Sequence, residues 1–143
     1  MLNLHGPSEP IETACSSSLV AIHRATELIR SGEVNMAIVG GVNTIVSPDL
    51  HISYSRAGML SEYGRCKTFS DQANGYARGE GAGILILKSL EQAEVDGDHI
   101  YGVILGSEEN HGGRANSLTA PNPNAQAELI KAHIVNLGLT QAL

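Results

Sequence analysis

The residue best suited to covalent chemistry is a cysteine near the amino end. Cys15 lies in the stretch TACSSSL at positions 13–19, where an extended segment is expected to pass into a helix. A thiol at a helix start faces unpaired N–H groups, which stabilise a thiolate and can hold the oxyanion formed on an attacked carbonyl. Cys15 is therefore a candidate nucleophile. Its position alone leaves open the alternative of a buried, inert cysteine.

Other reactive side chains give weaker signals. Cys66 lies between two cations but has no helix start behind it, so we interpret it as structural. Glu80 lies in the glycine-rich stretch RGEGAG (78–83) and is interpreted as a buried hydrogen-bonding or ion-paired group and not as an acid catalyst. That stretch matches a dinucleotide loop poorly, because its glycines precede the expected strand instead of following it. The cysteines and histidines lack the spacing of a structural zinc site, so no metal is expected.

None of the histidines is an obvious partner for Cys15. His23 lies two turns along the same helix, so its ring is expected to point into packing and not at the thiol. His111, in the stretch NHGG (110–113), is interpreted as structural. The remaining four carry no signal beyond a solvated or packed histidine: His5, His51, His99 and His133.

The elements that must position these residues alternate between strands and helices, which predicts an α/β layered fold. Leu19, Ile22, Thr26 and Ile29 recur on one face and predict a helix from Ser16 that ends near position 32. The rest of the pattern predicts strands at 11–14, 36–42, 83–88 and 99–107, helices at 48–58, 89–95 and 124–136, and a long loop at 61–78. The strands at 36–42 and 83–88 are expected to be buried.

Composition excludes several classes of function. The 143 residues carry a formal net charge of −6 and few aromatic side chains, which argues against a nucleic-acid partner. No apolar run is long enough for a membrane span, and no signal peptide is recognisable. Two cysteines cannot form a disulfide framework, so we expect a cytoplasmic location. Neither terminus shows a closing element, and we expect the chain to be a piece of a longer protein.

Several motifs in family order resemble the ketosynthase (β-ketoacyl synthase) domains of modular polyketide synthases. The stretch TACSSSLVAIH (13–23) resembles their active-site segment, and Glu12 stands where the family usually has aspartate. The NHGG stretch resembles ketosynthases that are served by separate acyltransferases. The other matching stretches are GGVN (40–43), SP (47–48), MLS (59–61), GRCKTF (64–69), GYARGEGAG (75–83), NHGG (110–113) and LTAPN (118–122).

The resemblance implies a partial, incomplete thiolase-like fold of layered αβαβα type. Residues 1–97 would be the later part of the N-terminal half, and residues 98–143 the opening strand and helix of the C-terminal half. It also implies that Cys15 takes an acyl chain and that a malonyl-type extender condenses with it after losing carbon dioxide. The family's two catalytic histidine motifs, His-Gly-Thr and a Gly-His after Lys-Ser-Asn, do not occur in this sequence, so the chain alone is expected to be inactive in condensation.

The resemblance further implies an acyl carrier protein as partner, a homodimer in the full-length parent and no bound cofactor, because the substrate arrives on phosphopantetheine. Thr119 resembles a position that lines the pantetheine channel. Three alternatives stay open: a fatty-acid condensing enzyme, a thiolase-like degradative enzyme and a non-catalytic ketosynthase-like binding or dimerisation partner. The sequence does not identify the acyl chain, the extender or the product.

Overall fold

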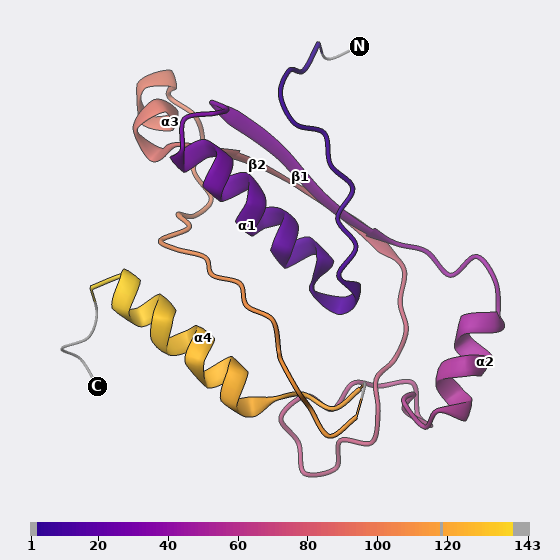
Figure 1. The fold of residues 1–143 in the computed structure, drawn as a ribbon. Coiled ribbons are helices and arrows are strands. Elements are labelled where there is room, and N and C mark those ends of the chain that lie inside the picture. The colour runs from indigo at the N-terminus through magenta and orange to yellow at the C-terminus, as the bar shows by residue number, and fades with distance from the viewer. Residues whose placement is uncertain (1–2, 118, 139–143) are drawn as a thin grey trace. The chain divides into compact units, whose positions relative to one another are not determined.

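The computed structural model describes residues 3–117 and 119–138 as a mixture of helices and strands (Figure 1). In chain order the elements are the 3-10 helix η1 (Ala14–Ser16), α1 (Ser17–Arg30), β1 (Met36–Asn43), α2 (Asp49–Arg56), β2 (Gly81–Lys88), α3 (Leu90–Asp96) and α4 (Pro123–Asn136). Helices and strands alternate from α1 to α3, as the sequence predicts, but no strand among the described residues separates α3 from α4.

Two of the helices, α3 and α4, begin where a side chain accepts their first N–H groups. Ser89 caps α3 by accepting the N–H of Gln92, and the Asn122 side chain accepts two N–H groups at the start of α4, where Pro123 takes the first position. In α1, burial is confined to the second half, at Ala25, Thr26 and Leu28. No helix in the described residues is both long and apolar enough to cross a bilayer.

The two strands pair in one sheet, and glycine permits their close approach. A Cβ added at Gly40 would lie 3.3 Å from the carbonyl oxygen of Gly83, so a larger residue there would crowd the neighbouring strand. The prediction that both strands are buried is wrong. Ile84 and Ile86 are 71% and 68% exposed, because the described residues do not cover both faces of this sheet.

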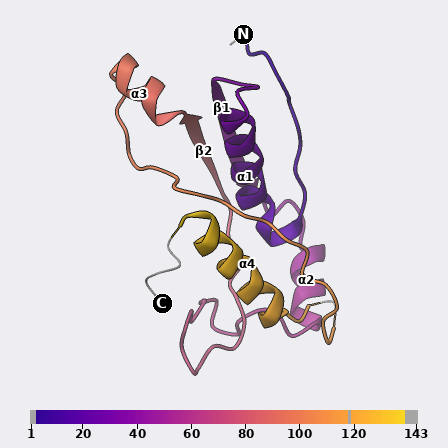
Figure 2. The same ribbon diagram turned by 60° about the vertical axis from the view of Figure 1, so that its left-hand side comes forward.

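The chain divides into two compact units. The first comprises Met1–Val39 and Leu85–Leu143, and the second Gly40–Ile84. In the first unit, the segment 105–110 lies between α1 and α4 (Figures 1 and 2). His23 on α1 hydrogen bonds to Ser107 at 2.8 Å, and Asn110 donates to a carbonyl of α4 at 2.9 Å. A Cβ at Gly106 would lie 2.5 Å from the imidazole of His133 on α4, so glycine lets this segment pass close to α4 without displacing that ring.

Two predicted strands are not formed. Residues 11–13 are irregular and Ala14 begins η1, while residues 99–107 are extended but belong to no strand. A strand needs a neighbour that pairs with its N–H and C=O groups, which an apolar sequence alone does not provide. The carbonyl of Leu105 instead accepts from the guanidinium of Arg30 at 3.1 Å.

Candidate active site

The thiol of Cys15 is exposed at the start of the longest amino-terminal helix. Cys15 lies within η1, two residues before α1 begins at Ser17. The first N–H groups of a helix have no partner within it, so they and the helix dipole favour negative charge at this place. An exposed sulfur can also be reached by a substrate. The position therefore suits a nucleophile better than a packed, inert cysteine.

The backbone immediately before Cys15 turns sharply and is held by side chains. Ala14 has φ +57°, in the left-handed region that residues with a Cβ seldom adopt. The Glu12 carboxylate accepts the Ala14 N–H at 2.8 Å, and the Ser17 hydroxyl donates to the Ala14 carbonyl at 2.7 Å. We call residues 12–17 the elbow. Sequence reasoning gave Glu12 no role there, although a carboxylate just before a run of serines is a turn signal.

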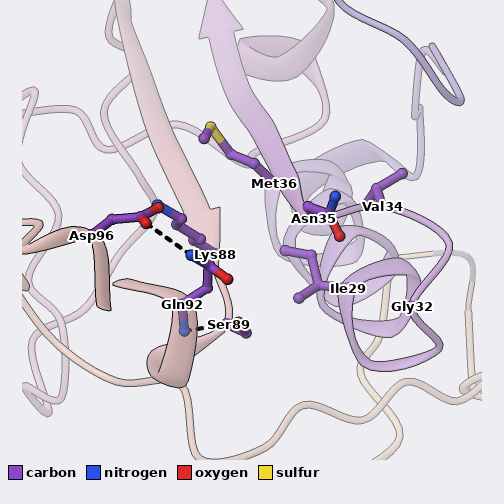
Figure 3. A pocket seen from close by; sticks show the side chains of 9 residues that line it. All are labelled: Ile29, Gly32, Val34, Asn35, Met36, Lys88, Ser89, Gln92 and Asp96. Atoms are coloured by element: carbon purple, nitrogen blue, oxygen red, sulfur yellow. Dashed lines mark hydrogen bonds and ion pairs between the residues drawn. The ribbon is translucent and has the colours of Figure 1, made fainter. Parts of the chain in front are cut away.

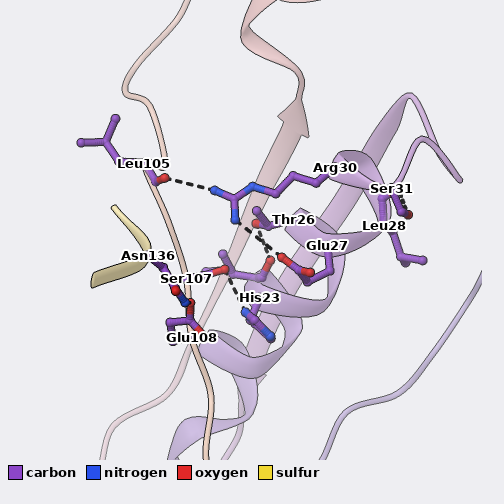
Figure 4. A network of polar contacts seen from close by, with 11 residues as sticks. His23, Thr26, Glu27, Leu28, Arg30, Ser31, Leu105, Ser107, Glu108 and Asn136 are labelled. Carbon is purple, nitrogen blue, oxygen red and sulfur yellow. Dashed lines mark hydrogen bonds and ion pairs between the residues drawn. The ribbon is translucent and has the colours of Figure 1, made fainter. Parts of the chain in front are cut away.

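The helix that follows the elbow is tied to its neighbours by polar contacts (Figure 4). The first of these is the bond from His23 to Ser107, so the imidazole points away from Cys15, as its helical spacing predicts. Arg30 contacts Glu27 at 3.6 Å as well as the Leu105 carbonyl. These contacts hold α1 against the segment 105–108. They thereby fix the position of the helix at whose start Cys15 lies.

The extended residues before the elbow are held by an ion pair. Arg24 on α1 meets the carboxylate of Glu9 at 3.3 Å, and this hydrogen bond raises the pKa of the Arg24 guanidinium. Both side chains are about half exposed, so solvent screens the pair and its contribution to stability is small. Its effect is to keep residues 9–12 alongside α1.

The other residues singled out from sequence make local contacts. The sulfur of Cys66 accepts the N–H of Ala77 at 3.2 Å, which suits a structural role. The Glu80 carboxylate accepts the N–H of Ile45, so it is hydrogen-bonded as predicted. The prediction that Glu80 is buried is wrong, because the described residues leave it exposed. His111 Nδ1 accepts the N–H of Gly113 at 2.9 Å within its own loop. None of these contacts involves Cys15.

Thr119 lies in the turn that precedes α4 and is exposed. Its assignment to the pantetheine channel stays a prediction. Among the described residues, no three histidine, cysteine, aspartate or glutamate side chains gather in a way that could hold a metal ion.

A cavity of about 400 Å³ lies in the first unit, between the end of α1 and the start of α3 (Figure 3). Lys88 on its wall is bound by Asp96 and by Asp98, the latter at 2.7 Å, so its amine is engaged and not a free nucleophile. These bonds, foremost the one that Lys88 donates to Asp96, raise the pKa of Lys88. The cavity is lined by Ile29, Gly32, Val34, Asn35, Met36, Lys88, Ser89, Gln92 and Asp96.

The second unit has a polar cavity of about 470 Å³ beside α2. Its lining includes His51, Ser55, Glu62 and Asn74, but neither cysteine. Neither of these two cavities is lined by a cysteine, and the exposed Cys15 at the elbow remains the best candidate for covalent chemistry.

Comparison with known proteins identifies the class. The model of the β-ketoacyl synthase N-terminal domain family matches residues 1–93, which is more than half of the chain. The chain therefore belongs to this family. Its segment before α1, with the exposed cysteine, lies within the matched part.

Curated polyketide synthases are similar to the chain over most of its length. The chain is 66% identical over 138 residues to polyketide synthase PksN of Bacillus subtilis, covering 96% of this chain and 2% of that protein. It is 51% identical over 129 residues to probable polyketide synthase 1 of Dictyostelium discoideum, covering 87% of this chain and 4% of that protein.

Solved structures show the same fold. The ketosynthase from module 6 of the bacillaene synthase of Bacillus subtilis 168 superimposes with a TM-score of 0.93 at 48% identity, over 95% of this chain and 25% of that chain. The oxazolomycin ketosynthase domain of Streptomyces albus gives 0.89 at 40% identity, over 93% and 24%. The chain therefore has part of a thiolase-like ketosynthase fold and spans about a quarter of the solved ketosynthases.

Proposed function

We propose that this chain is the nucleophile-bearing segment of a polyketide ketosynthase and that Cys15 accepts an acyl chain from an acyl carrier protein. The observation that carries this proposal is the exposed Cys15 at the start of α1. It is supported by the 66% identity of the chain to a polyketide synthase and its 48% identity to a solved ketosynthase. The relatives found are polyketide synthases, so we favour this reading over a fatty-acid enzyme or a non-catalytic relative.

The proposed acylation is a thioester exchange. The Cys15 thiolate attacks the carbonyl of an acyl-phosphopantetheine thioester, and a tetrahedral oxyanion forms. N–H groups at the helix start stabilise that charge, which is the usual function of such donors. The oxyanion then collapses, the pantetheine thiolate leaves, and the acyl chain stays on Cys15 as a new thioester. One thioester bond breaks and one forms, so the step needs no redox partner.

The second proposed stage is decarboxylative condensation. A malonyl-type extender loses carbon dioxide, its carbanion forms a carbon–carbon bond to the acyl carbonyl, and the Cys15 thiolate is released. Negative charge on the extender's thioester oxygen needs donors, and the loss of one such donor typically costs about 2.7–4 kcal/mol of barrier. The resemblance assigns that function to two histidine motifs that this sequence does not contain. We therefore expect acylation without condensation from this chain alone.

The remaining parts of the proposal concern assembly. We place the boundary between the two ketosynthase halves near residue 97, at the end of α3. We propose a homodimer in the parent protein, no resident cofactor, and Thr119 as a contact to the pantetheine arm. A cytoplasmic location is supported by two cysteines that are both free.

Intact-mass spectrometry tests the acylation. The chain is incubated with a short acyl thioester of N-acetylcysteamine, and the adduct is located by peptide mapping. We expect one acyl group on Cys15, none on a Cys15→Ala variant, and unchanged labelling in a Cys66→Ala variant. A full-length protein whose Cys15 stays unloaded by its acyl carrier protein would support the non-catalytic alternative. A condensation product from the purified 143-residue chain would overturn the assignment of the second stage.

A further inference from the structure

Ala14 adopts an uncommon backbone conformation directly before the candidate nucleophile. Its φ of +57° lies in the left-handed region, and only two other described non-glycine residues, Asn3 and Phe69, share a positive φ. A residue with a Cβ keeps this conformation only when its surroundings hold it there. Because Ala14 directly precedes Cys15, its backbone conformation sets the direction in which the Cys15 side chain points.

Both peptide groups of Ala14 are held by polar atoms. On the amino side, the Glu12 carboxylate accepts the Ala14 N–H at 2.8 Å. On the carboxyl side, the Ser17 hydroxyl donates to the Ala14 carbonyl at 2.7 Å and accepts the Thr13 N–H at 2.8 Å. The Ser17 hydroxyl has only one proton to donate. Its distance to the Glu12 carboxylate is 3.4 Å, much longer than its distance to the Ala14 carbonyl, so the proton goes to the carbonyl. Glu12 is therefore the acceptor that restrains the amino side of Ala14.

We propose that Glu12 is a positioning residue, whose carboxylate holds Ala14 in the left-handed conformation and so aims the Cys15 thiol at an acyl carbonyl. This inference rests on the proposed function of Cys15. Glu12 does not touch the sulfur in this arrangement and acts through the backbone. An acceptor at position 12 is what the elbow requires, and aspartate or glutamine can also reach an N–H two residues along the chain.

The test compares two reactions of the same sulfur. Alkylation by iodoacetamide reports whether Cys15 is reachable, whereas transfer of an acyl group from an N-acetylcysteamine thioester also requires correct aim. For Glu12→Ala we expect acylation to slow roughly 10- to 100-fold, since small misplacements of reacting groups have effects of that size, while alkylation changes less than about twofold. Glu12→Asp and Glu12→Gln keep an acceptor and should restore acylation.

Matched controls are available within the chain. Glu128→Ala removes an exposed carboxylate of α4 that contacts Lys131 at 3.0 Å and not the elbow, so acylation should stay near the original rate. Alkylation of Cys66, in the other unit, shows whether the variant disturbs the chain as a whole. Equal slowing of acylation and alkylation in Glu12→Ala, or no rescue by Glu12→Asp and Glu12→Gln, would overturn the proposal.

A second measurement separates this inference from the proposed function. A left-handed residue gives a strong nuclear Overhauser effect between its own amide and α protons. With Ile86→Thr and Leu105→Thr present to remove exposed apolar surface and limit association, we expect Ala14 to show this effect in the chain with Glu12 and lose it in Glu12→Ala. If it persists in Glu12→Ala, the positioning role is wrong even when Cys15 accepts acyl groups. If it disappears while the original chain is never acylated at Cys15, the proposed function fails and the restraint by Glu12 stands.

Discussion

At the scale of single residues, the two cysteines differ in what surrounds their sulfur atoms. Cys15 lies at the start of α1, whereas the sulfur of Cys66 already accepts the N–H of Ala77 at 3.2 Å. Both residues are exposed, so accessibility does not distinguish them. The comparison of their reaction rates therefore measures the effect of the helix start.

We predict that iodoacetamide at neutral pH modifies Cys15 before Cys66. A helix start stabilises a nearby negative charge by about 0.3–1 kcal/mol, which corresponds to a rate advantage of roughly two- to fivefold. Peptide mapping at short reaction times gives both rates in one sample, and Cys66→Ala checks that labelling of Cys15 is independent. Faster labelling of Cys66 would show that the neighbouring Arg65 and Lys67 are the stronger influence and would weaken the case for Cys15.

At the scale of elements, Gly75 allows two distant loop segments to pair. The Ser61 N–H donates to the Tyr76 carbonyl at 2.9 Å, and the Tyr76 N–H donates to the Met59 carbonyl at 3.0 Å. Gly75 has φ +130°, and a Cβ there would lie 2.5 Å from the carbonyl carbon of Leu60. Glycine is therefore required on both conformational and steric grounds.

We predict that Gly75→Ala disrupts this pairing and exposes the Tyr76 amide to exchange. Backbone atoms stand in the way of the new methyl group, and no flexible side chain can move aside for it. Amide hydrogen exchange measures the loss of protection at Ser61 and Tyr76. Gly79→Ala is the matched control, because a Cβ there meets nothing within 4 Å. Unchanged protection in Gly75→Ala would show that the loop accommodates the methyl group by shifting.

The ion cluster after β2 predicts a dependence on pH. The pKa of Asp96 is lowered from its ordinary 3.8, mainly by the hydrogen bond from Lys88 and then by that from Gln92. The stabilisation is thus present above pH 3.8 and is lost as the pH falls through the lower folded pKa. The pKa of Lys88 is raised above its ordinary 10.5. Its contribution to stability is therefore present at neutral pH and is lost only as the pH rises through that higher pKa.

Carbon-13 detected titration of the Asp96 carboxyl group tests this prediction. In Lys88→Met the midpoint should rise toward 3.8 but stop short of it, since Gln92 still donates to Asp96 at 2.8 Å. Gln92→Ala should give a smaller rise, because Lys88 is the larger influence. An Asp96 titration that is the same with and without Lys88 would show that the pair does not form in solution.

The elements that sequence predicts correctly are those with local causes. The apolar spacing of α1, the Ser89 cap of α3 and the Asn122–Pro123 start of α4 can each be read from neighbouring residues. Residues 11–14 and 99–107 were predicted wrongly as strands, because pairing depends on a partner elsewhere in space. The site divides in the same way. The sequence indicates Cys15 through its helix start, but the left-handed Ala14 depends on contacts with Glu12 and Ser17 that no propensity reveals.

At the scale of the whole molecule, much apolar surface faces solvent. The accessible area is 11,700 Å², against about 7,000 Å² expected for a folded protein of 15.0 kDa. Among the described residues, the buried apolar side chains are only Ala25, Leu28, Val39 and Ala93. Exposed apolar groups occur in both units, for example Ile86 at 68% and Leu105 at 72% in the first and Val46 at 91% in the second. Surface of this kind favours association.

We predict that the isolated 143-residue chain self-associates at micromolar concentration and unfolds without a sharp, cooperative transition. The net charge of −6 opposes association, so added salt should promote it by screening that repulsion. Light scattering measures the size of the species, and Ile86→Thr with Leu105→Thr should reduce it by removing exposed apolar surface. Gln126→Thr, at an exposed and already polar position of α4, leaves the net charge unchanged and is the matched control, so it should not reduce association. A monodisperse monomer with a sharp melt would contradict this prediction, because it would require a core that the described residues do not show.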